Sequence, residues 1–213
     1  GRHTIVPWDE TVPMDRDFVL NWQLNPSQQT EGAVLMEEIG GDTFALLMLV
    51  PPRQVSSLAR LPREMLFIID SSGSMGGESI RQARAALMAA LDRLHPGDRF
   101  NIIDFDDRYR SLFTQPVPVA DDTLSQARSF VRGLDAGGGT EMLPPLRAAL
   151  AMHATPGYLR QVMFITDGVV SNEHAIFSLV HNQLGEARLF TVGIGSAPNS
   201  YFMRKAADFG RGT

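Results

Sequence analysis

The sequence predicts an α/β protein: a doubly wound, mostly parallel sheet flanked by helices and preceded by a short antiparallel β segment. Two patterns support this. From about residue 64 onward, short apolar runs alternate with segments of helical spacing. Before residue 50, short apolar segments are separated by turn residues. The change of pattern predicts a partial β-rich segment over 1–50, a linker over 51–63 and an α/β domain over 64–213.

The first part contains three segments that predict antiparallel strands, at residues 17–22, 33–38 and 44–50. Gly40-Gly41-Asp42 lies between the last two and predicts a hairpin turn. About 60 residues of such sequence are too few for a comfortable core. We therefore expect this part to be the tail of a β domain, and Gly1 to be an interior position of a longer protein.

The second part contains four strongly apolar runs that predict strands covered on both faces, at about 65–70, 100–105, 160–166 and 188–194. A short strand at 109–113 is expected to form a hairpin with the strand before it. Helical spacing predicts helices at 78–94, 122–134, 142–153, 173–184 and 199–209. Sheets with this order of elements bind ligands beyond the carboxyl ends of their strands.

The composition narrows the classes of function. The 213 residues are 44% hydrophobic and 20% charged, with a formal net charge of −5. The sequence contains no run of about 18 apolar residues, the length that a membrane-spanning helix needs. The negative charge and the lack of a basic run argue against nucleic-acid binding. The absence of cysteine excludes disulfides, thiolate nucleophiles and cysteine-based metal sites.

The loop after the first apolar run, Asp70-Ser71-Ser72-Gly73-Ser74, is the first candidate site. Alternate residues of a tight loop can direct Asp70, Ser72 and Ser74 toward one point. Such a cluster of oxygen atoms suits a hard cation such as Mg²⁺ or Mn²⁺. The alternative is a polar turn in which Ser72 or Ser74 caps a helix.

Two later loops lead to the same end of the predicted sheet. Asp167 follows the strand at 160–166, and Thr140 ends a glycine-rich loop before a helix expected to start near Glu141. Taken separately, Asp167 fits an Asp-Gly turn and Thr140 fits an ordinary helix cap. Taken together, the three loops predict one cation site.

These five residues, in this order, resemble the complete metal-ion-dependent adhesion site of a von Willebrand factor A domain. The resemblance covers about residues 63–213. Within that family the sequence is most similar to the inter-alpha-trypsin inhibitor heavy chain type and its bacterial relatives, through the stretches Leu94–Phe100 and Phe130–Leu134. The segment Asp15–Leu20 and the Pro51-Pro52 exit are similar to the end of the VIT-like β domain that precedes the A domain there.

The resemblance implies a role for each residue. Ser72 and Ser74 would bind the cation directly, Thr140 directly in the ligand-competent state, and Asp70 and Asp167 directly or through water. Mg²⁺ or Mn²⁺ is expected, with Ca²⁺ as a further candidate. A Glu or Asp carboxylate of a partner protein would complete the coordination. Since both aspartates must be ionised, affinity is expected to fall at acid pH.

The implied function is divalent-cation-dependent protein binding and adhesion, without catalysis, nucleic-acid binding or membrane insertion. We expect the parent protein to be bacterial and to lie outside the cell, on its surface or in the periplasm. The family pattern continues with one more strand and a last helix that this sequence lacks. We therefore expect an open sheet edge that could favour self-association.

Two other functions stay open at this stage. One is a cytosolic A-domain subunit of a metal-chelatase or similar assembly. The other is a Mg²⁺-dependent phosphohydrolase. Such an enzyme would need a second acid at the position of Ser72. It would also need a supporting lysine, and Lys205 is the only lysine in the sequence. A serine hydrolase is disfavoured because no Gly-x-Ser-x-Gly surrounds Ser72 or Ser74. Three acids after the second strand, Asp104, Asp106 and Asp107, either tune the approach of a partner or form a solvated loop.

Overall fold

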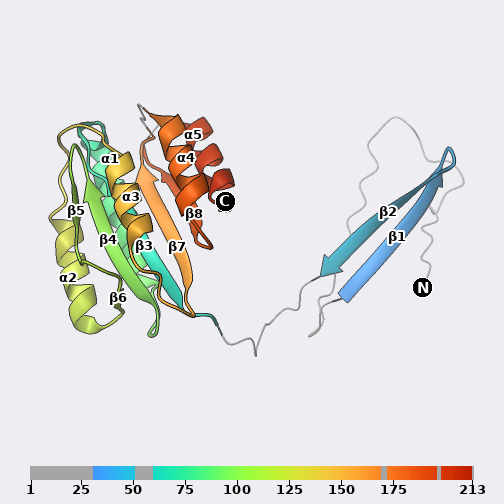
Figure 1. The fold of residues 1–213 in the computed structure, drawn as a ribbon, viewed down its shortest axis with the longest axis horizontal. Coiled ribbons are helices and arrows are strands. Elements are labelled where there is room, and N and C mark those ends of the chain that lie inside the picture. The colour runs from blue at the N-terminus through green and yellow to red at the C-terminus, as the bar shows by residue number, and fades with distance from the viewer. Residues whose placement is uncertain (1–30, 51–59, 169–171, 196–197, 213) are drawn as a thin grey trace, which may run out of the picture. The chain divides into compact units, whose positions relative to one another are not determined.

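The computed structural model of the chain describes residues 31–50, 60–168, 172–195 and 198–212 (Figure 1). The chain divides into two compact units, residues 1–59 and 60–213, which are described separately. Among the described residues, no helix has the length and apolar character needed to cross a bilayer.

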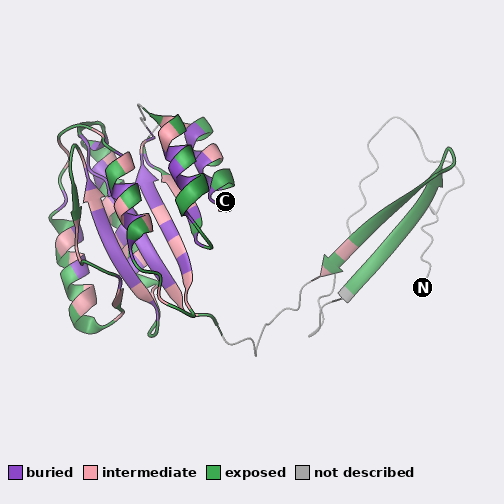
Figure 2. Cartoon of the chain, viewed as in Figure 1, coloured by how far each residue is buried: buried purple, intermediate pink, exposed green. Residues whose placement is uncertain are grey.

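The first unit contains an antiparallel hairpin of β1 (Glu31–Ile39) and β2 (Asp42–Val50). Gly40 and Gly41 form the turn with φ of 63° and 91°, a conformation that favours glycine. The predicted hairpin is thus confirmed, whereas the expected strand at 17–22 lies outside the described residues. Figure 2 shows the hairpin as mostly exposed, with Met48 and Val50 of intermediate burial. Eight of its large apolar side chains are more than half exposed: Val34, Leu35, Met36, Ile39, Phe44, Leu46, Leu47 and Leu49.

The second unit is built on a six-stranded sheet in which β3 is central. Its strands are β3 (Arg63–Asp70), β4 (Arg99–Phe105), β5 (Tyr109–Ser111), β6 (Val117–Pro118), β7 (Leu159–Thr166) and β8 (Arg188–Gly193). The order is β5-β4-β3-β7-β8, with β6 paired to β4. The pairs β3/β4, β3/β7 and β7/β8 are parallel, whereas β5 and β6 run antiparallel to β4. The predicted fold class and the hairpin of β4 and β5 are confirmed.

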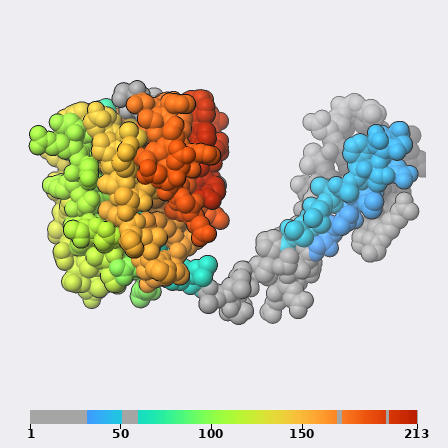
Figure 3. Space-filling view, in the orientation of Figure 1, coloured from blue at the N-terminus to red at the C-terminus, as the bar shows by residue number. Residues whose placement is uncertain are grey.

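Helices cover both faces of this sheet. On one face lie α1 (Glu78–Asp92) and α2 (Asp121–Arg132). On the other lie α3 (Leu143–Ala151), α4 (Glu173–Gln183) and α5 (Ser200–Phe209), which form one continuous surface in Figure 3. A short 3₁₀ helix, η1 (Gly73–Met75), follows β3 and was not predicted.

The central strand shows how the sheet fixes side-chain direction. Met65, Phe67 and Ile69 pack toward α1 and α2, whereas Leu66 and Ile68 pack toward α3 and α4. All five are at least 94% buried. Because alternate residues of a strand point to opposite faces, Asp70 continues the row of Leu66 and Ile68.

Charged groups are buried at the opposite, amino-terminal end of the sheet. Asp98, which precedes β4, is 1% exposed and accepts hydrogen bonds from Arg60, from the backbone and guanidinium of Arg63, and from the His95 N–H. Burial alone would raise the pKa of Asp98, but the hydrogen bonds from Arg63 and His95 outweigh it, so the pKa lies below its ordinary value. Asp98 therefore ties the start of β3 to the loop before β4.

The outer edge of β8 is partly occupied by the chain itself. The Leu189 N–H donates to the Gly210 carbonyl at 2.9 Å. A Cβ added to Gly212 would lie 1.9 Å from the Leu189 carbonyl oxygen, so only glycine fits this close approach. The sheet edge that we expected to be open is therefore covered at Leu189 by residues 210–212.

Candidate metal centre

The loop after β3 forms a hydrogen-bonded cluster of oxygen atoms around Asp70. Asp70 is fully buried, and its Oδ1 accepts the Ser72 N–H at 2.9 Å. Its Oδ2 accepts the hydroxyl of Thr166 at 2.6 Å. The Ser72 and Ser74 hydroxyl oxygens lie 3.1 Å apart. The structure thus brings three of the five predicted residues together.

Neither serine caps a helix through its side chain. Ser72 precedes η1 but makes no side-chain cap hydrogen bond, and α1 begins after Gly77 rather than after Ser74. Ser72 is the N-cap residue of η1 by position only, because its side chain does not make the hydrogen bond that capping requires. The hydroxyls remain available as ligands.

The glycine-rich loop lies directly against the Asp70 loop. The Gly137 N–H donates to the Ser71 carbonyl at 2.9 Å, and the Gly73 N–H donates to the Gly138 carbonyl at 3.1 Å. Gly138 has φ of 72°, and an added Cβ would lie 3.0 Å from Oδ1 of Asp107. These two reciprocal hydrogen bonds join segments that are far apart in the sequence.

Thr140 is half-buried in this second loop, but it does not cap α3. The helix starts at Leu143 with Met142 as its N-cap residue, two residues later than the start expected near Glu141. The reason is that the Glu141 N–H donates to the Asp106 carbonyl, which holds residue 141 in the loop. Among the described residues, no hydrogen bond joins the Thr140 hydroxyl to the other four candidate ligands.

Asp167 follows the end of β7 and lies close enough for its charge to act on Asp70. Burial raises the pKa of Asp70, and the negative charge of Asp167 raises it further, while hydrogen bonds from Ser72 and Thr166 act in the opposite direction. Gly168 has φ of 81°, the backbone conformation that an Asp-Gly turn favours. Two carboxylates therefore share one end of the sheet.

The donor set fits a hard divalent cation. The five predicted ligands would supply two carboxylates and three hydroxyls, and oxygen ligands of this kind suit Mg²⁺, Mn²⁺ and Ca²⁺. Within the described ranges, no group of three His, Cys, Asp or Glu residues is arranged to hold a metal. Any cation at this rim would consequently depend on the hydroxyls as well as on Asp70 and Asp167.

Thr166 is the residue of this site that sequence reasoning missed. It is fully buried and hydrogen-bonded to Asp70, one of the predicted ligands. The signal was present in the sequence, because a hydroxyl residue immediately preceding Asp167 stands beside Asp70 once the two strands are paired in register. The sequence pattern did not specify that β3 and β7 are neighbours or in which register they pair.

An acidic hollow of about 570 Å³ adjoins the candidate metal centre next to Ser71. Asp104 lines it and pairs with Arg110 at 2.9 Å. The Arg108 N–H donates to Asp106 at 2.8 Å and lowers the pKa of Asp106. The loop after β4 is thus an ordered part of the rim, with arginine as well as aspartate side chains.

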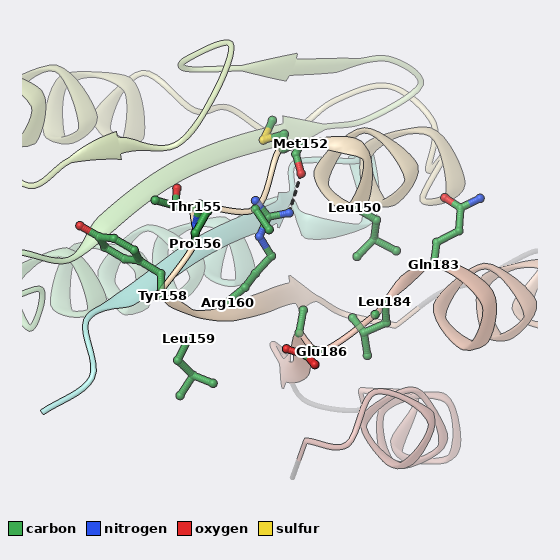
Figure 4. Close-up of a pocket in the computed structure, with 14 residues that line it drawn as sticks. Leu150, Met152, Thr155, Pro156, Tyr158, Leu159, Arg160, Gln183, Leu184 and Glu186 are labelled. Atoms are coloured by element: carbon green, nitrogen blue, oxygen red, sulfur yellow. Dashed lines mark hydrogen bonds between the residues drawn. The ribbon is translucent and has the colours of Figure 1, made fainter.

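A second pocket, of about 400 Å³, lies at the other end of the sheet, near the start of β7 (Figure 4). Arg160 lines it and donates to the Met152 and His153 carbonyls. The same guanidinium is paired with the fully buried Glu64 on β3. Its polar groups hold the fold together, so we assign no function to this pocket.

Comparisons with known proteins agree with this architecture. The model of the von Willebrand factor type A domain matches residues 63–213. A von Willebrand factor A domain-containing protein of Dictyostelium discoideum is 38% identical over 135 residues, which are 63% of this chain and 16% of that protein. The human von Willebrand factor A domain-containing protein 5B1 is 28% identical over 202 residues, covering 92% of this chain and 17% of that protein.

Solved structures show the same fold. A von Willebrand factor type A protein from Catenulispora acidiphila superposes with a TM-score of 0.63 at 23% identity, covering 90% of this chain and 46% of that one. The conserved hypothetical protein BatB from Bacteroides thetaiotaomicron gives 0.57 at 15% identity, covering 70% of this chain and 87% of that one. The chain spans only 16–17% of the length of the two curated relatives named above. From the family match over residues 63–213, this chain belongs to the von Willebrand factor type A domain family.

Proposed function

We propose that this protein is a divalent-cation-dependent protein-binding module whose metal centre takes a Glu or Asp carboxylate from a partner. The observation that carries the proposal is the Asp70, Ser72 and Ser74 cluster, placed beside Asp167 at the carboxyl end of the sheet. Domains of this family typically mediate protein interactions, which supports the same function.

In this proposal each residue has a distinct task. The Ser72, Ser74 and Thr140 hydroxyls hold the cation, and Asp70 and Asp167 balance its charge. When bound, the cation supplies a Lewis-acidic position at which a partner's carboxylate can replace water. Mg²⁺ is the first candidate, with Mn²⁺ next and Ca²⁺ as a further one.

A binding role fits the residues better than catalysis. A phosphohydrolase would need an acid at position 72, where a fully buried serine stands. Lys205 Nζ donates to the Tyr201 hydroxyl at 2.6 Å and lies over the Phe177 ring. These contacts place the lysine among α4 and α5 side chains rather than in the Asp70 loop. The relatives are likewise named for this domain.

The subtype and the location are also parts of our proposal. We assign the chain to the inter-alpha-trypsin inhibitor heavy chain type, with a VIT-like segment before the domain. The match to the human relative over 92% of the chain extends beyond residues 63–213 and supports a combination of both parts. We place the parent protein outside a bacterial cell, on its surface or in the periplasm, where an adhesive module can meet partners.

Removal of the Asp70 carboxylate tests the proposal. Titration calorimetry with Mg²⁺, Mn²⁺ and Ca²⁺ is expected to give binding heats for the wild type and none for Asp70→Ala. Asp122→Ala, which removes an exposed acid from the first turn of α2, is the matched control and should bind as the wild type does. Equal heats from the wild type and Asp70→Ala would refute the metal centre.

A further inference from the structure

We propose that Thr166 is a positioning residue that fixes both carboxylates of the metal centre and makes the centre prefer Mg²⁺ over Ca²⁺. This inference rests on the proposed function. It concerns a residue outside the five candidate ligands, and it follows from the way β3 and β7 are paired.

The register of the two strands places Thr166 beside Asp70. Ile69 pairs with Ile165 in the parallel ladder of β3 and β7, so Asp70 and Thr166 follow side by side. Both residues are fully buried. Because they occupy equivalent positions on neighbouring strands, their side chains point to the same face of the sheet.

The Thr166 hydroxyl makes one hydrogen bond as donor and one as acceptor. Oγ1 of Thr166 accepts the Gly168 N–H at 3.0 Å and lies 2.6 Å from Oδ2 of Asp70. An ionised carboxylate can only accept, so the Thr166 hydroxyl donates its proton to Asp70 while its oxygen accepts the Gly168 N–H. A short hydrogen bond to a carboxylate, shielded from water, is stronger than one between neutral groups.

The Asp70 carboxylate is consequently held from two sides. Ser72 donates its N–H to Oδ1, and Thr166 donates its hydroxyl to Oδ2. These donors come from the loop after β3 and from the neighbouring strand. Rotation of the carboxylate would break at least one of the two hydrogen bonds, so Asp70 is oriented before any cation arrives.

The same hydroxyl also acts on the backbone that carries Asp167. By accepting the Gly168 N–H, Thr166 closes the turn in which Asp167 is the middle residue. One side chain thus positions both negative groups of the centre. Mg²⁺ demands near-ideal octahedral geometry, whereas Ca²⁺ tolerates irregular and variable coordination. Loosening both carboxylates should therefore weaken the binding of Mg²⁺ more than the binding of Ca²⁺.

Calorimetric titration of the chain with Mg²⁺ and with Ca²⁺ tests the inference. Thr166→Val, which keeps the shape and removes the hydroxyl, is expected to lower Mg²⁺ affinity about tenfold, the usual scale for losing a residue that orients a ligand. Its Ca²⁺ affinity should fall less. Thr166→Ser, which keeps the hydroxyl, should restore both affinities.

Thr191→Val is the matched control. Thr191 lies on β8, and its hydroxyl donates to the Met203 carbonyl at 3.0 Å, away from the Asp70 loop. The same chemical change there should alter neither metal affinity. Thermal unfolding without metal compares the folded states of the variants. Should Thr166→Val fail to fold, Thr166→Cys, with its weaker donor, should show an intermediate ratio of the two affinities.

The outcomes separate this inference from the proposed function. If the wild type binds Mg²⁺ and Thr166→Val binds it equally well, the role of Thr166 is refuted and the metal centre stands. If Thr166→Val loses Mg²⁺ and Ca²⁺ affinity by the same factor, Thr166 does not discriminate between the two cations and the selectivity claim is refuted. If the wild type binds neither cation, the proposed function fails and takes this inference with it.

Discussion

The Gly138 carbonyl accepts one of the two hydrogen bonds that join the two loops of the candidate metal centre. Gly138 adopts a positive φ and lies against Asp106 and Asp107. We expect Gly138→Ala to destabilise the fold by about 1 kcal/mol through its backbone conformation. It should also weaken Mg²⁺ binding, because the methyl group would displace the loop.

A matched variant separates these two effects. Gly157 has φ of 81°, yet an added Cβ there meets no atom within 4 Å. Gly157→Ala should show the loss of stability without the loss of Mg²⁺ affinity, as measured by urea unfolding and calorimetry. Equal Mg²⁺ affinities for the two variants would show that the approach of Gly138 to Asp106 and Asp107 has no bearing on the centre.

Asp98 is a single buried residue at the opposite end of the sheet, where several hydrogen bonds meet. Since it is buried and bonded to Arg60, Arg63 and His95, Asp98→Asn should lower the free energy of unfolding by about 3 kcal/mol. Asp92→Asn, which weakens an exposed pair with Arg128, should change it by less than about 1 kcal/mol. A comparable loss in both variants would contradict this assignment.

The Asp98 contribution should depend on pH in a defined direction. The pKa of Asp98 is lower in the folded state than its ordinary value of about 3.9. The ionised group therefore stabilises the protein above about pH 4, and this stabilisation is lost as the pH falls through the folded pKa. Urea unfolding at a series of pH values should show the wild type and Asp98→Asn converging below about pH 4.

At the scale of elements, a buried cross-strand pair joins β3 to β7. Glu64 and Arg160 are paired in the ladder, and the Glu64 carboxylate is fully buried. Arg160→Met should cost about 4 kcal/mol, because it leaves that carboxylate without its cation. The double variant Glu64→Leu and Arg160→Met should recover part of this loss in urea unfolding, whereas an equal or larger loss would contradict the argument.

The sequence predicted the main strands because their residues are apolar on both faces, and it predicted the long helices because their spacing is clear. It did not predict η1 or β6. The 3₁₀ turn Gly73–Met75 contains a single buried apolar residue, Met75, and so shows no period. The two-residue strand Val117–Pro118 is defined only by its pairing with β4.

The five candidate ligands were predictable because each stands at the end of an element or in a loop of distinctive composition. Thr166 was not, because its role arises from the register of two strands that are separated by most of the domain. The start of α3, two residues later than expected, could not be predicted for the same reason. It depends on the hydrogen bond from Glu141 to Asp106, which joins two loops that no local pattern connects.

At the scale of the whole molecule, the candidate ligands all lie in the second unit, residues 60–213. We expect a fragment of these residues to unfold cooperatively and to bind Mg²⁺ with the affinity of the whole chain. Mg²⁺ at a hundred times its Kd should raise the free energy of unfolding by about 2.7 kcal/mol. Thermal unfolding with Mg²⁺ and with EDTA measures this, and a fragment that binds no Mg²⁺ would show that the first unit is required.

The reciprocal hydrogen bonds between the Asp70 loop and the glycine-rich loop impose an order on the assembly of the centre. During synthesis, Asp70 and both serines leave the ribosome long before Thr140 and Asp167. Until β7 has joined β3, the emerged segment offers one carboxylate and two hydroxyls, too weak a set to retain a divalent cation. If the centre binds a cation as we propose, a nascent chain should gain metal affinity only after most of the domain has been made.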